Sequence, residues 1–141
     1  MKNQQHINDH LRRLHMNFNG LFNIALFIAT LIPYGVQAQV SLEATRDGAS
    51  NGKVLVIDIR EPNEHATGVA KGMKLIPMST LGQRLGELPK DANKPVLLIC
   101  NTQNRSSAVV RELQSRGYTN VQYVNSGMSE WVRRGWAIQK P

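Results

Sequence analysis

The sequence is short of the features that mark several common classes of protein. It has one cysteine in 141 residues, so no intramolecular disulfide can form and the fold depends on its hydrophobic core. Aromatic residues make up 6% of the chain, and no run of lysine and arginine is interleaved with them, which argues against a nucleic-acid surface. No internal repeat or low-complexity tract is present, which argues against a repeat architecture.

The longest apolar run lies near the N-terminus and is too short for a comfortable membrane span. It covers residues 21–32, whereas a spanning helix needs about 20 apolar residues. Basic residues precede the run, and Val36 and Ala38 follow it with the small side chains that a signal peptidase reads. This order predicts a signal peptide over residues 1–38, a mature domain over 39–141, and a periplasmic or secreted protein without a stable membrane anchor.

An uncleaved anchor is the alternative to this signal peptide, and Met16 is an alternative to Met1 as the true start. The whole chain carries a formal net charge of +7, and cleavage after Ala38 would remove three basic residues and one acidic residue, leaving +5. A positive surface attracts small anions. The free thiol of an exported protein is expected to be either buried and inert or used in chemistry.

The mature region alternates apolar runs with helical segments. Continuous branched residues predict strands over residues 53–59, 74–77, 96–99 and 120–124. Helices are predicted from Pro62, over 80–88 with Ser79 as N-cap, from Ser106 to Gly117, and over 127–134. Residues 40–52 predict only a short strand or turn and then a loop. Strands that alternate with helices indicate an α/β domain with a mostly parallel central sheet flanked by helices.

The stretch from Val96 to Ser107 carries the clearest chemistry. Cys100 directly follows a buried strand, and a polar loop then leads through Arg105 into a helix start. Such a helix start presents unpaired N–H groups and the positive end of the helix dipole, and both favour an anion such as a thiolate. A packed, inert cysteine is the alternative, but it needs no polar loop after it. Cys100 is therefore predicted to be a nucleophile.

Four motifs resemble the single-domain rhodanese (thiosulfate sulfurtransferase) family. Cys100, followed five positions later by Arg105 and then Ser106, is similar to the active-site loop of that family. The other matches are residues 57–62 to its Asp-Val-Arg-Glu-Pro segment, 68–77 to its Gly-x-x-x-Gly-x-x-x-Ile-Pro stretch, and 127–131 to its closing Gly-Met-x-x-Trp. Together they span roughly residues 53 to 136 in the expected order, which is far more specific than one Cys-x4-Arg pattern.

The resemblance implies a rhodanese-like three-layer fold and a sulfurtransferase activity. Cys100 would take a sulfane sulfur from thiosulfate or a similar small anionic donor, hold it as a persulfide, and pass it to cyanide or a thiol. Arg105 would be the second catalytic residue and would order the loop with its guanidinium fork. Neither a cofactor nor a metal is implied, and the protein partner stays open. The residues assigned to substrate binding are Asn101, Thr102, Gln103, Asn104, Ser106 and Arg60.

Four residues outside the cysteine loop receive structural interpretations. Asp58 and Arg60 are predicted to form a structural ion pair, with substrate binding by Arg60 as the alternative. His65 lacks a partner pattern and is predicted to lie on the surface. Trp131 is predicted to anchor the core.

Several residues depart from the pattern of the family. Gln103 stands where many members have glycine, and a position with positive φ favours glycine or asparagine. Ser126 replaces another glycine, and Val69 and Lys71 replace the usual histidine and proline. These changes bear on substrate preference more than on the fold.

Two other functions remain open from the sequence. Related phosphatases on this fold also use a cysteine loop and an arginine, but their loops have five residues between the two, whereas this chain has four. The smaller loop suits a single bound sulfur better than a tetrahedral phosphate. A catalytically idle binding domain is the other alternative, and the intact Cys100 and Arg105 argue against it.

Overall fold

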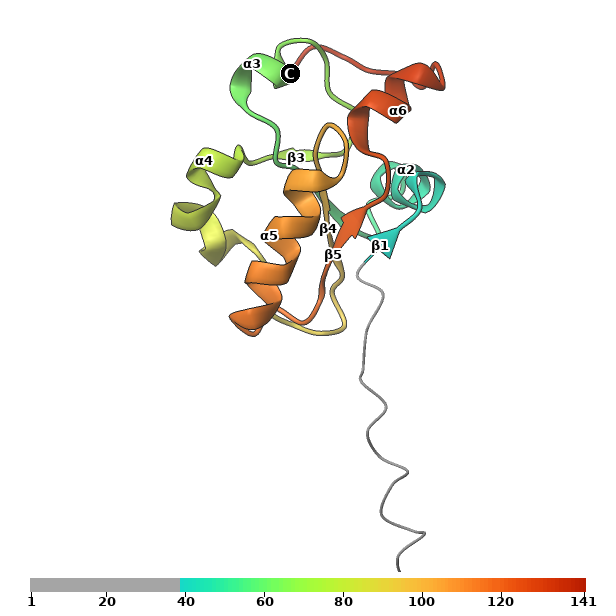
Figure 1. Cartoon of the computed structure of the whole chain (residues 1–141). Helices are drawn as coiled ribbons and strands as arrows, with labels where there is room; N and C mark the ends of the chain where they lie inside the picture. Colours follow the sequence, from blue (N-terminus) through green and yellow to red (C-terminus); the bar gives the residue numbers. More distant parts are fainter. Residues whose placement is uncertain (1–38) are drawn as a thin grey trace, which may run out of the picture. The chain divides into compact units, whose positions relative to one another are not determined.

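The computed structural model describes residues 39–141, whose centre is a five-stranded sheet (Figure 1). In chain order the strands are β1 (Gln39–Val40), β2 (Leu55–Asp58), β3 (Lys74–Leu75), β4 (Val96–Ile99) and β5 (Val121–Val124). Their order across the sheet is β1-β5-β4-β2-β3, and every pairing is parallel. The carboxyl ends of all five strands therefore meet at one edge, with β4 in the middle. The predicted signal peptide, residues 1–38, lies outside the described residues.

Helices cover both faces of this sheet. They are α2 (Leu42–Ser50), α3 (Pro62–His65), α4 (Met78–Leu81), the 3-10 helix η1 (Gly82–Glu87), α5 (Asn104–Ser115) and α6 (Gly127–Arg133). The predicted α/β class, with three layers and a parallel sheet, is confirmed. Within residues 39–141, no helix combines the length and the apolar character needed to cross a membrane.

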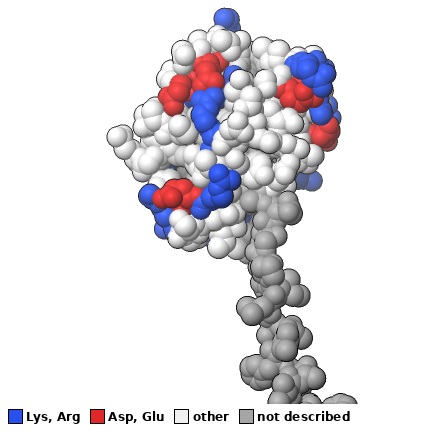
Figure 2. Space-filling view, in the orientation of Figure 1, with Lys and Arg blue, Asp and Glu red and all other residues white. Residues whose placement is uncertain are grey.

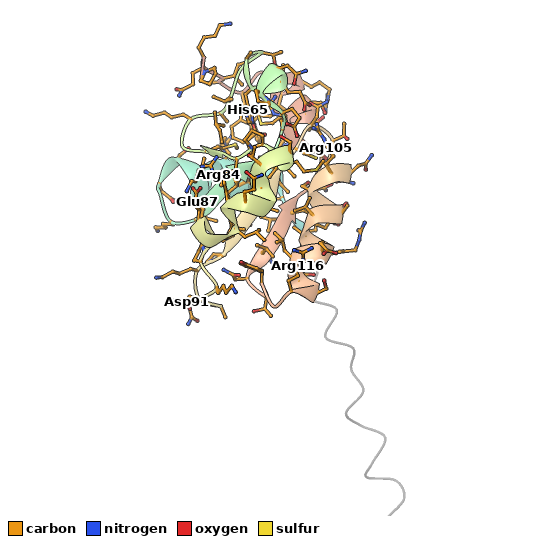
Figure 3. The ribbon with its side chains drawn as sticks, turned by 90° about the vertical axis from the view of Figure 1, so that its left-hand side faces the viewer. His65, Arg84, Glu87, Asp91, Arg105 and Arg116 are labelled. Carbon is orange, nitrogen blue, oxygen red and sulfur yellow. The ribbon has the colours of Figure 1, made fainter. Side chains whose placement is uncertain are left out.

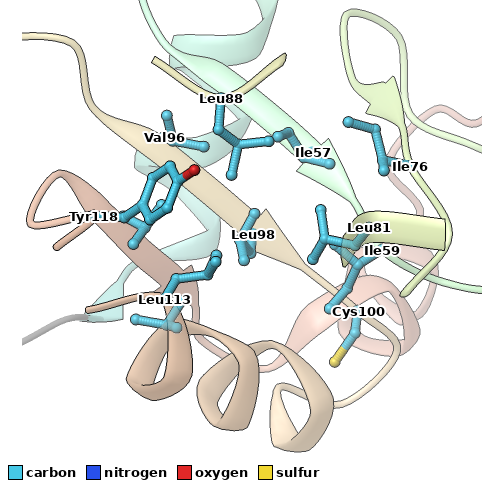
Figure 4. Close-up of a cluster of buried hydrophobic side chains, with 12 residues drawn as sticks. Ile57, Ile59, Ile76, Leu81, Leu88, Val96, Leu98, Cys100, Leu113 and Tyr118 are labelled. Atoms are coloured by element: carbon cyan, nitrogen blue, oxygen red, sulfur yellow. The ribbon is translucent and has the colours of Figure 1, made fainter. Parts of the chain in front are cut away.

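The alternation of side chains along β4 divides the core into two clusters. Leu98 and Cys100 point to the face that α4 and α5 cover, where they pack with residues such as Leu81 and Leu113 (Figure 4). Leu97 and Ile99 point to the opposite face, where the cluster contains residues of α2 and α6. Because the period of a strand is two, this parity places the cysteine under α5. Trp131 of α6 is buried in the second cluster, as predicted.

Helix α2 is the main element that the sequence did not predict. The prediction of a loop within residues 40–52 is wrong, because Leu42–Ser50 forms a nine-residue helix. Ser41 caps it, since its side-chain oxygen accepts a hydrogen bond from Ala44 N–H at 3.2 Å. Three of the four residues that the helix buries, Thr45, Gly48 and Ala49, are small, and one of these is polar. The buried face therefore does not form an apolar stripe that the sequence would reveal.

The segment after β3 also differs in detail from its prediction. Pro77, rather than Ser79, precedes α4, and the helix tightens into η1 at Gly82. Ser79 lies inside α4, where its N–H and hydroxyl donate to the Glu61 carboxylate at 3.1 and 2.7 Å. The predicted N-cap residue therefore links α4 to the segment that follows β2.

Candidate active site

Cys100 lies directly after β4 and is 1% exposed. Its sulfur accepts a hydrogen bond from Ser106 N–H at 3.4 Å, and its S–H donates to Ser106 Oγ at 3.5 Å. Ser106 is fully buried and belongs to the first turn of α5. The start of this 12-residue helix therefore faces the sulfur, as the sequence predicted, and its dipole favours the thiolate.

Opposing influences set the pKa of the Cys100 thiol. Burial is the largest and acts to raise the pKa, because a low-dielectric interior disfavours the charged form. The hydroxyl and N–H of Ser106 act to lower it, as do the backbone N–H groups of Thr102 and Arg105. These donors together outweigh burial, so the pKa lies below its ordinary value and the nucleophilic thiolate is favoured.

The loop between Cys100 and α5 makes its turn at Gln103. Gln103 has φ 77° and ψ −19°, so the position has the positive φ that glycine would favour, although the residue is glutamine. Its carbonyl oxygen accepts hydrogen bonds from Ser107 N–H at 2.8 Å and from Ser106 Oγ at 3.1 Å. When the thiol ionises, the Ser106 hydroxyl no longer accepts from S–H and is free to donate to the sulfur instead.

Arg105 is held by a carboxylate from another element. Its Nη1 and Nη2 donate to Glu64 Oε2 and Oε1 of α3, both at 2.6 Å, and Arg105 lies at the beginning of α5 (Figure 3). These hydrogen bonds are the main reason why the pKa of Glu64 is lowered to about 2. The guanidinium fork therefore joins α5 to α3 rather than lying open to an anion. The sequence indicated Glu64 only as an acidic residue near a helix start.

Asp58 and Arg60 form the predicted ion pair, buried at the end of β2. The Asp58 carboxylate accepts from Arg60 Nε at 2.9 and 3.0 Å and from Nη2 at 2.7 Å. Nη2 also donates to Gly68 O at 2.8 Å, and Nη1 to Glu64 O at 3.4 Å. Arg60 is 4% exposed and its donors hold both the last residues of α3 and the chain after them. The pair therefore positions the helix that supplies Glu64.

His65 corrects one expectation from the sequence. It was predicted on the surface, but it is 5% exposed, and its Nε2 lies 3.5 Å from Asp58 Oδ1. The histidine is the last residue of α3. Arg60, paired with Asp58, donates to the backbone of this helix and of the chain after it, and so holds the helix against the end of β2. A four-residue helix is too short for its sequence to reveal which side is buried.

The turn after β5 closes the other side of the cysteine loop. Met128 N–H donates to Cys100 O at 2.8 Å, and Ser129 donates to Asn101 O from its N–H at 3.0 Å and from its hydroxyl at 2.8 Å. Gly127 has φ 74°, and a Cβ there would overlap the carbonyl oxygen of Cys100. The close approach therefore requires glycine. The sequence did not predict these hydrogen bonds.

The loop residues assigned to substrate binding differ in their relation to the buried sulfur. Asn101, Thr102 and Asn104 are exposed, whereas Ser106 is buried beside the sulfur. Within residues 39–141, no three His, Cys, Asp or Glu side chains are grouped to hold a metal ion. On the face shown in Figure 2, basic and acidic side chains lie beside one another in separate clusters. The site thus places the thiol of Cys100 among backbone N–H groups and one hydroxyl.

A family model described as the rhodanese-like domain matches residues 41–134. The chain belongs to this family. A sulfurtransferase of Allochromatium vinosum is 33% identical over 93 residues, which cover 66% of this chain and 85% of that protein. The protein YqhL of Bacillus subtilis is also 33% identical, over 109 residues that cover 76% of this chain and 85% of the relative.

A solved structure of the rhodanese type has the same fold. The crystal structure of a rhodanese-related protein from Thermoplasma volcanium matches with a TM-score of 0.63 and 27% identity, over 73% of this chain and 98% of that one. The resemblance to rhodaneses read from the sequence motifs is therefore confirmed at the level of family and fold.

We predict that Glu64→Gln destabilises the fold by about 1 kcal/mol at neutral pH, because the bidentate ion pair with Arg105 is lost. Glu64 has a pKa of about 2 in the folded chain against an ordinary value of 4.5. Its contribution is complete above about 4.5 and is lost as the pH falls toward 2. Denaturant unfolding at a series of pH values should show the two chains converging in acid.

Glu112→Gln is the matched control for this prediction. Glu112 pairs with Arg116 on the same helix, but both side chains are more than half exposed, so little change in stability is expected. A constant difference between wild type and Glu64→Gln from neutral pH down to pH 2 would contradict the assignment.

Proposed function

We propose that this chain is a sulfurtransferase that takes sulfur from thiosulfate through a persulfide on Cys100. The family match and the sulfurtransferase among its relatives support a role of the sulfurtransferase type. The observation that carries the proposal is the sulfur of Cys100, which lies among the Ser106 donors at the start of α5 and has a lowered pKa. The proposal needs no cofactor or metal.

The proposed reaction has two displacement steps at sulfur. The Cys100 thiolate attacks the outer sulfur of thiosulfate, a new S–S bond forms, and sulfite leaves with the electron pair of the bond that breaks. Cyanide then attacks the outer sulfur of the persulfide, thiocyanate leaves, and the thiolate is restored. Charge is conserved in each step. The first step converts the thiolate and thiosulfate into the persulfide anion and sulfite, and the second converts the persulfide anion and cyanide into the thiolate and thiocyanate. The donors that stabilise the thiolate are also suited to the persulfide anion.

The same geometry favours sulfur over phosphate as the transferred group. A bound phosphate is commonly held by a bidentate arginine fork. The Arg105 fork is paired with both oxygens of Glu64, and only four residues separate it from Cys100. A single sulfur atom places no such demand on the arginine, since backbone N–H groups and one hydroxyl suffice to stabilise it.

We predict that thiosulfate adds one sulfur atom to the chain and that cyanide removes it as thiocyanate. Cys100 is the only cysteine, so Cys100→Ser should show neither step while it keeps the circular dichroism of the wild type. Intact-mass spectrometry before and after each reagent measures both steps. A wild-type chain that never gains sulfur, or a Ser variant that does, would leave a catalytically idle binding domain as the better description.

We predict that Arg105→Lys folds but turns over thiosulfate and cyanide at least about tenfold more slowly, a barrier increase of about 1.4 kcal/mol. A lysine ammonium cannot donate to both Glu64 oxygens with the geometry of a guanidinium, so the start of α5 loses its link to α3. Arg116→Lys, in an exposed pair at the far end of α5, is the control (Figure 3). Full turnover in Arg105→Lys would make Arg105 a bystander.

We also propose that the protein is exported and cleaved after Ala38, and so acts in the periplasm or outside the cell. The apolar run over 21–32, the basic residues before it and the small residues at Val36 and Ala38 support this. Sequencing the N-terminus of the chain recovered from the exported fraction should read from Gln39. A mature chain that begins at Met1 or Met16 would overturn it.

A further inference from the structure

Gln103 has an unfavourable backbone conformation, and this conformation helps to position the hydrogen-bond donors around the Cys100 sulfur. Its φ of 77° is disfavoured for a residue with a Cβ atom. That conformation turns its carbonyl oxygen toward the first turn of α5, where it accepts from the Ser106 hydroxyl at 3.1 Å and from Ser107 N–H at 2.8 Å. The same Ser106 hydroxyl lies 3.5 Å from the Cys100 sulfur. The hydroxyl has one proton, so it donates to the Gln103 carbonyl while the thiol donates to it, and it can turn to the sulfur when the thiol ionises. In both states the Gln103 carbonyl keeps its bond to Ser107 N–H and so fixes the first turn of α5 beside the sulfur.

The side chain of Gln103 makes a second contact, across the site. Its Oε1 accepts a hydrogen bond from Ser126 N–H at 2.9 Å, in the turn between β5 and α6. The amide oxygen must face Ser126, because a backbone N–H can only donate. Ser126 itself has φ 69°, and within residues 39–141 these two are the only residues other than glycine with positive φ. The one hydrogen bond thus joins the two strained positions.

The turn that Gln103 contacts is also bonded to the beginning of the cysteine loop. Cys100 O and Asn101 O accept from Met128 and Ser129, so the first half of the loop is tied by its backbone. The Gln103 side chain ties the second half, just before α5 begins. The loop is therefore fixed to the β5–α6 turn on both sides of Thr102.

We propose that Gln103 is a positioning residue whose side-chain bond to Ser126 N–H holds the Ser106 donors on the Cys100 sulfur. The inference rests on the proposed function, because its purpose is to keep the loop in the shape that stabilises the sulfur anion. Gln103 does not touch the sulfur. It acts through Ser106, and its side chain compensates for the backbone conformation that its carbonyl needs.

Gln103→Met tests this, because methionine has a similar length but cannot accept from Ser126 N–H. Removing one hydrogen bond of this kind should speed amide exchange at Ser126 and slow sulfur loading from thiosulfate, each by about three- to tenfold. The pKa of the Cys100 thiol, followed by the ultraviolet absorbance of the thiolate, should rise. Gln103→Glu keeps an acceptor and should keep the slow exchange of Ser126. If Gln103→Met does not fold, Gln103→Gly still tests the hydrogen bond. Exchange at Ser126 should become faster, whereas the thiol pKa and the loading rate should stay near those of the wild type, because glycine adopts the positive φ without help from a side chain. Slow exchange at Ser126 in Gln103→Gly would overturn the proposal.

Gln114→Met is the matched control. The side chain of Gln114 also forms a hydrogen bond with the backbone, but its Nε2 donates, to Val121 O at 3.1 Å, and it lies at the far end of α5. It should leave the thiol pKa and the loading rate as in the wild type. A normal thiol pKa and loading rate in Gln103→Met would overturn the proposal, as would slow Ser126 exchange there. A wild type that never loads sulfur would overturn the proposed function alone, since the thiol pKa and the exchange are measured on the unloaded chain.

Discussion

The hydrogen bonds between Ser106 and the Cys100 sulfur are the constraint around which the site is arranged. They require the cysteine to lie on the face of the sheet that α5 covers, and the parity of β4 places it there. They also require the chain to reverse within a few residues, which places a residue with positive φ at Gln103. The sulfur is then buried next to a helix start without losing its hydrogen-bond donors.

The order of the strands supplies the two supports of the cysteine loop. β4 lies between β5 and β2, so the segments that follow both neighbours reach the end of β4. The segment after β2 forms α3, whose Glu64 holds Arg105 at the start of α5. The segment after β5 forms the turn that bonds to Cys100 O and Asn101 O. A cysteine on an edge strand would have only one such neighbour.

The sequence predicted those parts of the structure that depend on neighbours in the chain. The buried runs of β2, β4 and β5 and the helix start after Cys100 were visible because their patterns are local. Helix α2 was not, because apart from Leu42 its buried face is made of the small residues Thr45, Gly48 and Ala49. The burial of His65 was missed because α3 has only four residues.

Pairings between distant residues could not be predicted in the same way. Glu64 and Arg105 lie 41 positions apart, and Gln103 and Ser126 lie 23 apart, so no local pattern in the sequence relates the members of either pair. The sequence did identify Gln103 and Ser126 as two departures from glycine. Nothing local indicates that the side chain of the first binds the backbone of the second. The structure relates the two substitutions through one hydrogen bond.

The pairing of Arg105 with Glu64 also determines how the sulfur anion is stabilised. The carboxylate takes both branches of the guanidinium, so the groups that hydrogen-bond to the sulfur are N–H dipoles and a hydroxyl, and the charge of Arg105 acts on the thiolate only from a distance. A cation bound directly to the sulfur would hold the thiolate and the persulfide more strongly, and would also make both less reactive. Neutral donors lower the pKa of the thiol while leaving an anion that can still attack and be attacked. This balance suits the proposed role of Cys100, in which the sulfur accepts a sulfur atom and gives it up.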